Sequence, residues 1–208
     1  MEGTVNKPKL LLSFVLDNGV TIPGESLGAL MSGFRSFFAE TAQALSIETE
    51  LICYDAFSPC VIKSFVSPEV LPVAGGKFPL FGAAAQLALD RLLAREAEWK
   101  EKGVPTRRPW LFLLSDGMTL DDPESVVARM DAAEREGTVI VLPFRLSGGF
   151  LSERMQCLDR TKHMIGIIDG HIPQFFDFVA AKVKEIEMQA ADAPVRFDKT
   201  DFEGWALL

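Results

Sequence analysis

The sequence predicts an α/β fold: a doubly wound, mostly parallel sheet of six strands, with one antiparallel edge strand and helices on both faces. The first observation is an apolar run at residues 10–16 with large side chains on both faces, which is typical of a buried strand in a parallel sheet. The second is a similar run at residues 110–115. The two runs end in Asp17 and Asp116, at the carboxyl edge where open α/β sheets bind ligands. The third is the alternation of strand-like and helix-like segments along the chain.

The individual elements follow from periodicity and from turn residues. Apolar residues three and four positions apart indicate amphipathic helices, whereas short runs rich in β-branched residues indicate strands. The expected strands cover residues 10–16, 47–54, 60–66, 110–115, 139–144 and 164–168, and the expected helices cover residues 26–45, 80–102, 123–137, 151–158 and 172–188. The second and third strands are close enough in sequence for an antiparallel hairpin at one edge. Asp122 and Pro123 fit the start of a helix, and the charged residues 95–102 fit a solvated helix end.

Length and composition indicate one domain. At 208 residues, of which 48% are hydrophobic, the chain is long enough for a single domain with a two-sided core. We expect this domain at residues 8–188 and a C-terminal tail at residues 189–208. Trp205 in the tail can anchor it on the body of the domain or on a partner.

The charge distribution excludes several classes of partner. The formal net charge is −8 and the longest basic cluster is Arg107 with Arg108, so neither nucleic acid nor an anionic membrane is an expected partner. No apolar run approaches the roughly 20 residues of a membrane span, and residues 1–7 are too polar for a secretory signal. We therefore expect a soluble, cytoplasmic protein that binds other proteins.

The three cysteines do not have the spacing of a metal site. Cys53 and Cys60 can face each other across the hairpin, and Cys157 lies far along the chain. Reduced thiols in the core are the simpler interpretation.

The order of elements and motifs resembles a von Willebrand factor A domain. The resemblance depends on the first strand with its Asp-x-x-x-Thr turn, the hairpin, a Gly-Gly turn, and the segment Arg-Pro-Trp-Leu-Phe-Leu-Leu-Ser-Asp-Gly at residues 108–117. It covers residues 8–186. The chain is most similar to the stand-alone bacterial A-domain proteins of tellurium-resistance and related stress operons. The resemblance implies the doubly wound fold, a protein partner and a place in a bacterial stress-response or tellurium-resistance-type assembly.

The resemblance also implies a degenerate metal site. In this family a metal-ion-dependent adhesion site consists of Asp-x-Ser-x-Ser, a loop threonine and a second aspartate, whose oxygens suit Mg²⁺. Asp17, Thr21 and Asp116 stand at three of these positions, but Gly19 replaces one serine, and Phe78 or, with a shifted gap, Lys77 replaces the threonine. We therefore expect no cofactor, or Mg²⁺ bound weakly. The residues expected to line the site are Asn18, Gly19, Lys77, Phe78, Gly117 and Met118.

Lys77 offers a replacement for the metal. Two carboxylates held close together without a cation raise each other's pKa, and an ammonium group placed between Asp17 and Asp116 would relieve this repulsion. The glycines that precede Lys77 give its loop the freedom to reach inward. The sequence thus predicts a fold that does not depend on divalent metal.

These patterns predict a non-enzymatic protein-binding module. Its binding surface is expected at the loops of residues 18–25, 74–79 and 118–122, where Met118 and Leu120 are apolar. One alternative is that Asp17 is only a turn former. The other is a phosphatase of the haloacid-dehalogenase type, because Asp17-x-Gly19-x-Thr21 resembles the Asp-x-Asp-x-Thr motif with Asp17 as nucleophile. Gly19 stands where that family has its general acid.

Overall fold

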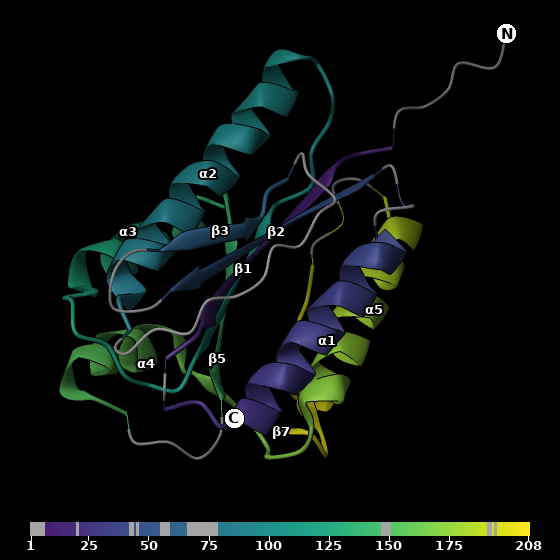
Figure 1. Ribbon diagram of the computed structural model, residues 1–208. Helices are drawn as coiled ribbons and strands as arrows, with labels where there is room; N and C mark the ends of the chain where they lie inside the picture. The colour runs from purple at the N-terminus through teal and green to yellow at the C-terminus, as the bar shows by residue number, and fades with distance from the viewer. Residues whose placement is uncertain are drawn as a thin grey trace, which may run out of the picture.

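The protein is a single twisted sheet covered by helices on both faces, as the computed structural model shows (Figure 1). The structure describes residues 7–19, 21–41, 44, 46–54, 59–65, 79–146, 151–190, 193 and 195–208. The sheet has seven strands in the order β3-β2-β1-β4-β5-β6-β7. The strands are β1 Leu10–Asp17, β2 Ile47–Tyr54, β3 Cys60–Lys63, β4 Trp110–Ser115, β5 Ile140–Leu146, β6 Ile165–Ile167 and β7 Ala206–Leu207.

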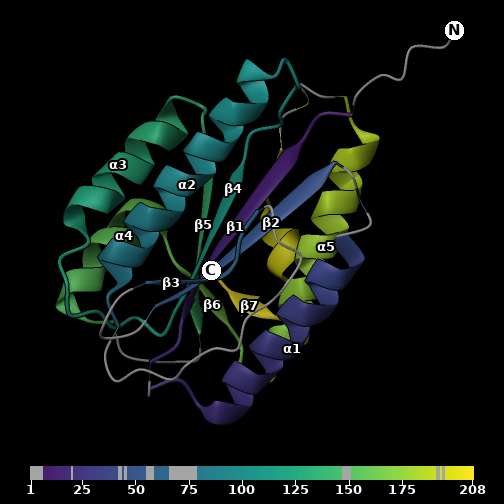
Figure 2. The same ribbon diagram turned by 45° about the horizontal axis from the view of Figure 1, so that its top comes forward.

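The helices divide between the two faces of the sheet. They are α1 Gly24–Thr41, α2 Phe81–Glu101, α3 Glu124–Arg135, α4 Gln156–Lys162 and α5 Ile172–Met188, with short 3₁₀ turns η1 Glu153–Met155 and η2 Lys199–Phe202. Figure 2 shows α1 and α5 on one face and α2, α3 and α4 on the other. Among the helices described, none combines the length and the apolar composition that a membrane span requires. The predicted doubly wound α/β fold is confirmed.

The strand order creates a crevice between β1 and β4. The chain leaves β1 for β2 and β3 on one side, and then returns through α2 to β4 on the other side of β1. Strand order therefore reverses between these two parallel strands, which is where open α/β sheets place their sites. Asp17 is the last residue of β1, and Asp116 directly follows β4.

Each face of the sheet has its own core, because successive side chains of a strand point to opposite faces. Phe14 and Phe112 pack toward α1 and α5, whereas Leu11 and Val15 pack toward α2. Helix α3 begins at Glu124, one residue later than predicted, and Asp122 accepts a hydrogen bond from the Glu124 backbone N–H at 3.0 Å.

The C-terminal residues differ from the expected tail. Strand β7 pairs antiparallel with β6, which adds a seventh strand and a second antiparallel edge to the sheet. Phe202 and Trp205 are buried against Phe144 and Phe178, with ring centroids 5.2–6.3 Å apart. Trp205 thus docks on the body of the domain. Strand β7 leaves little signal in the sequence because it is two residues long.

The charged end of α2 is solvated only in part: most of residues 95–102 are exposed as predicted, but Arg95 and Trp99 pack against the body of the domain. The Nε of Arg95 lies 2.7 Å from Glu48 on β2, and the Trp99 indole N–H donates to the same carboxylate at 3.2 Å. Lys9 and Lys102 lie over the Trp99 ring, at 4.6 and 5.1 Å from its centroid. The charge pattern of the segment did not reveal this packing, because Glu48 and Lys9 are distant from Arg95 and Trp99 in the sequence.

The hairpin prediction is confirmed, with a shorter third strand. β3 pairs antiparallel with β2, and Cys53 is in register with Cys60. Cys53, Cys60 and Cys157 are not joined by disulfide bonds. Cys60 is exposed, so the expectation that all three thiols lie in the core is wrong for this residue.

Candidate functional site

Two carboxylates meet at the crevice between β1 and β4. The Asp17 side chain is fully buried, and its Oδ1 accepts a hydrogen bond from the Gly19 N–H at 2.7 Å. Asp116 Oδ1 accepts one from the Met118 N–H at 2.8 Å, and the Thr21 hydroxyl donates to Asp116 Oδ2. The structure therefore brings together the three residues that the sequence placed at ligand positions.

Gly19 shapes the space between these groups. A Cβ added to Gly19 would lie 3.0 Å from Asp17 Oδ1 and 3.5 Å from Thr21 Oγ1. A side chain at this position would therefore press on the Asp17 carboxylate. The glycine that departs from the family motif is the residue that leaves room for the turn to fold back onto Asp17.

Burial keeps a proton on Asp17. Loss of solvent raises the pKa of Asp17 to about 8, the negative charge of Asp116 adds to this effect, and the Gly19 N–H opposes it. The Asp17 carboxyl is therefore largely neutral near pH 7. Because a bound cation would favour the ionised form instead, proton and metal would compete for this group.

A row of polar side chains at the ends of four strands was missed in the sequence. Asp17 is in register with Tyr54 on β2, and Ser115 on β4 is in register with Arg145 on β5. Leu16 on β1 is in register with Leu114 on β4, and Asp17 and Ser115 are the next residues of these strands. The four polar side chains therefore lie at the same level of the sheet and on the same face. The available signal was that each polar residue interrupts an apolar strand near its carboxyl end.

Tyr54 is the buried member of this row on β2. Burial raises the pKa of its phenol well above the usual range, and the charge of Asp17 contributes in the same direction. Its ring lies edge-on to Phe81, with centroids 6.0 Å apart. The row thus extends from the crevice into the core beneath α2.

The oxygen atoms present fit a hard cation only in part. Two carboxylates and one hydroxyl face the crevice, and Asp17 Oδ2 is buried with no hydrogen-bond partner among the described residues. Within the same part of the chain, no three His, Cys, Asp or Glu side chains gather into a metal-binding cluster. Asp17 and Asp116 would hold Mg²⁺ with water molecules in its remaining positions. A weak metal site stays a prediction.

The loop that follows Asp116 is held in place by backbone hydrogen bonds. The Leu120 N–H donates to the Pro79 carbonyl and the Ser152 N–H to the Gly117 carbonyl, both at 2.9 Å. Gly117 has a φ of +94°, a conformation that favours glycine. Two apolar side chains nevertheless point to solvent from this loop: Met118 is 38% exposed and Leu120 is 51% exposed.

The same loop caps helix α2. Asp121 accepts hydrogen bonds from the backbone N–H groups of Gly82 and Ala83 at 3.1 and 2.8 Å. Thr119 accepts one from the Phe81 N–H at 3.2 Å. A carboxylate at a helix N-terminus satisfies free N–H groups and complements the helix dipole. This carboxylate therefore has a structural role.

The other predicted residues are divided between the described and undescribed parts of the chain. Asn18 is buried, and its N–H donates to the Tyr54 carbonyl at 3.1 Å. Lys77 and Phe78, together with the turn at residues 75–76, lie outside the described residues. The proposed replacement of the metal by Lys77 therefore stays a prediction.

Comparison with known proteins gives a structural match. No family model matches the sequence, and no curated protein matches it. The crystal structure of the SpRpn10 VWA domain is similar, with a TM-score of 0.55 and 15% sequence identity over 83% of this chain and 95% of that domain. At this level of identity the likeness concerns the fold alone. The strand order, the crevice between β1 and β4 and this match together give the chain a von Willebrand A-like fold.

Proposed function

We propose that this protein is a non-enzymatic protein-binding module that contacts its partner through the loops at the carboxyl edge of the sheet. The surface centres on the apolar pair formed by Met118 and Leu120. The observation that carries the proposal is the exposure of both side chains on a loop whose backbone is fixed. Exposed apolar groups on an ordered loop favour association, since little conformational freedom is lost on binding.

The location of the apolar pair supports a binding role. In the part of the chain that the structure describes, the other large apolar side chains that are exposed are Met188, Leu207 and Leu208. Of these described side chains, Met118 and Leu120 flank the crevice at the switch point of the sheet. A partner docked there would cover the apolar pair and reach the Thr21–Asp116 hydrogen bond beside it.

The chemistry of Asp17 favours binding over phosphatase activity. A nucleophilic carboxylate has to be ionised and accessible to substrate. Asp17 is fully buried, and its pKa is raised to about 8. Gly19 also supplies no general acid. Both features disfavour the phosphatase alternative, which turnover of a phosphate ester abolished by Asp17→Asn would restore.

The biological setting is the part of the proposal that depends on the sequence resemblance. The segment at residues 108–117 resembles the stand-alone bacterial A-domain proteins of tellurium-resistance operons. We infer a cytoplasmic role in a bacterial stress-response or tellurium-resistance-type assembly. The identity of the captured partner tests this setting separately from the binding surface.

The experiment compares three variants of the full chain. The partner is first identified by affinity capture from the native host and purified, and its Kd is then measured with each variant. Met118→Glu and Leu120→Glu should each weaken binding about tenfold or more, because an apolar contact is lost and a charge is buried. Met188→Glu, which alters a side chain that is 83% exposed at the end of α5, is the matched control and should bind like the wild type. Equal effects of all three substitutions would contradict the proposed surface.

A further inference from the structure

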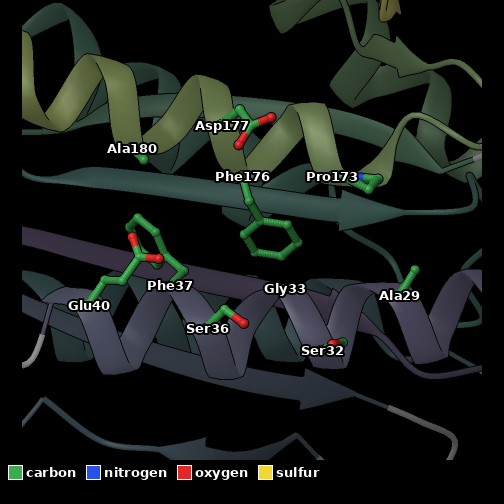
Figure 3. Close-up of a pocket in the computed structure, with 10 residues that line it drawn as sticks. All are labelled: Ala29, Ser32, Gly33, Ser36, Phe37, Glu40, Pro173, Phe176, Asp177 and Ala180. Atoms are coloured by element: carbon green, nitrogen blue, oxygen red, sulfur yellow. The ribbon is translucent and has the colours of Figure 1, made fainter.

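A groove of about 360 Å³ lies between α1 and α5, on the face of the sheet opposite α2. Its floor is apolar and includes Phe37 from α1 and Phe176 from α5 (Figure 3). Figure 3 shows Glu40 rising from α1 beside Phe37, and Asp177 standing on α5 next to Phe176. The groove thus combines aromatic rings with a carboxylate from each of the two helices that form it.

Gly33 determines the shape of the groove. A Cβ added at this position would lie 2.1 Å from Cε2 of Phe176. The missing side chain therefore lets the Phe176 ring pack directly against the backbone of α1. The neighbouring Ala29, Ser32 and Ser36 are small, so the space above the rings stays open.

The two carboxylates of the groove have no partner within the described part of the chain. Glu40 and Asp177 are exposed, and neither forms an ion pair or a hydrogen bond there. Acids on the opposite face are paired: Asp90 lies 2.5 Å from Arg129, and Asp131 lies 3.0 Å from Lys162. The groove is therefore a place where none of the described residues neutralises the negative charge.

We propose that this groove binds an arginine side chain presented by a basic segment of a partner protein. A guanidinium is planar and weakly hydrated, so it can lie on aromatic rings while its N–H groups point to carboxylates on both sides. Lysine offers a more strongly hydrated point charge without this flat shape. The volume is within the range of pockets that enclose small ligands, which suits a single side chain with its flanking residues.

The inferred partner agrees with the charge of the whole protein. The net charge of −8 attracts basic segments and repels anionic surfaces. The groove is formed by the flanks of α1 and α5, whereas the apolar pair lies on the loop after β4. The inference therefore goes beyond the proposed function, and either can fail without the other.

The test uses a fluorescent peptide of alternating leucine and arginine residues, flanked by glycine and serine. Its matched controls carry citrulline, which is neutral and similar in shape, or lysine in place of arginine. Fluorescence anisotropy with the full chain should show binding of the arginine peptide below about 1 mM, a Kd that corresponds to about 4 kcal/mol. The citrulline peptide should bind at least about fivefold more weakly, and the lysine peptide should lie between the two. Raising NaCl from about 50 to about 500 mM should weaken the arginine complex, because the carboxylates are exposed.

Charge-matched variants locate the site. Glu40→Gln and Asp177→Asn should each weaken the arginine peptide about 2–5-fold, and together about tenfold. Glu101→Gln and Glu136→Gln change the net charge equally at exposed positions outside the groove, so they should bind like the wild type. Ser36→Trp should block binding without removing charge, and thermal melting should show that it is folded.

Three outcomes would overturn the inference. The first is no binding of the arginine peptide at about 1 mM. The second is equal affinity for the citrulline peptide, which would indicate apolar binding alone. The third is an equal loss in the groove variants and in the Glu101 and Glu136 controls, which would indicate attraction to net charge rather than to the groove.

Discussion

The two faces of the sheet are built on different principles. Toward α1 and α5 the core is aromatic: Phe14 stacks on Phe112 with centroids 4.7 Å apart, and Phe34 meets Phe176 edge-on at 5.0 Å. Toward α2 the core is aliphatic and rich in alanine. That face also holds the buried carboxylates of Asp17, Glu50 and Glu96. The stability of the first face depends on close packing of aromatic rings, whereas that of the second also depends on ion pairs and hydrogen bonds of buried polar groups.

The charge pairs beneath α2 link that helix to one particular strand. Glu50 on β2 is fully buried, its Oε2 lies 2.5 Å from the Nε of Arg91, and its Oε1 accepts a hydrogen bond from Ser13 at 3.3 Å. One turn along α2, Arg95 pairs with Glu48. Two ion pairs in line along the helix oppose any sliding of α2 over the smooth alanine surface. On the aromatic face, the close packing of the rings opposes such sliding of the helices.

The largest expected effect comes from removing one partner of the buried pair. Arg91→Met leaves the Glu50 carboxylate buried without its counter-charge, so we expect the free energy of unfolding to fall by about 2–4 kcal/mol. The double variant Glu50→Leu/Arg91→Met should recover to within about 1 kcal/mol of the wild type, since it removes the charge as well. Urea unfolding followed by circular dichroism measures both.

The control for this prediction is an exposed pair on the same face. Arg129 pairs with Asp90 at 2.5 Å, and both side chains are about half exposed. Arg129→Met should therefore cost less than about 1 kcal/mol. If it costs as much as Arg91→Met, burial is not what makes the Glu50 pair important.

The pH dependence of the same variant provides a second readout. Burial raises the pKa of Glu50 above its usual 4.5 even though Arg91 opposes the shift. The native state then binds this proton more tightly than the unfolded state, so the contribution of Glu50 to stability falls as the pH rises above about 4.5. Without Arg91 this fall should be steeper. The destabilisation by Arg91→Met should thus be smaller at pH 4 than at pH 7.

A smaller effect is expected from two glycines of α1, and it tests the packing of the aromatic face. Gly33→Ala places a methyl group 2.1 Å from the Phe176 ring, so we expect a loss of about 1–3 kcal/mol from overpacking. Gly28→Ala meets nothing within 4 Å and should stabilise the helix by up to about 1 kcal/mol. The two variants change the same residue type in the same helix. Urea unfolding should therefore give opposite signs, and a gain for both would show that Phe176 is free to move.

Much of the fold could be predicted because the strong patterns are local. The bounds of β2, β4 and α5 agree with the periodicity, since apolar runs and amphipathic stripes depend only on neighbouring residues. Strand β7 could not be predicted, because its two residues form a strand only through pairing with β6. The packing of Trp99 against Lys9 was missed for the same reason.

The candidate site was predicted in part. Asp17 and Asp116 could be found because each ends a buried strand, and the topology then brings them together. Tyr54 and Arg145 were missed because their relation to Asp17 depends on strand register, which one sequence does not specify. The raised pKa of Asp17 likewise reflects three-dimensional burial.

A further effect of pH is expected at Asp17, where the polar face meets the crevice. Its pKa is raised from 3.8 to about 8, so the native state binds the proton more tightly than the unfolded state. Its contribution to the free energy of unfolding therefore decreases as the pH rises from about 4 to about 8. Asp17→Asn removes this dependence, so without metal its stability relative to the wild type should be higher at pH 8 than at pH 4. Urea unfolding at these two pH values measures the difference.

Adding divalent metal distinguishes two possible sources of positive charge beside Asp17, which are Lys77 and a bound Mg²⁺. If Lys77 already supplies the positive charge, the melting temperature of the wild type should change by less than about 1 °C between chelator and millimolar Mg²⁺. Lys77→Thr should then gain stability from Mg²⁺, because a cation that binds only the native state stabilises it. Asp17→Asn should not respond, which serves as the control. A wild type whose melting temperature rises by several degrees in Mg²⁺ would contradict the prediction of a weak metal site. It would show that a bound ion stabilises the crevice, as Arg91 stabilises the buried Glu50 carboxylate.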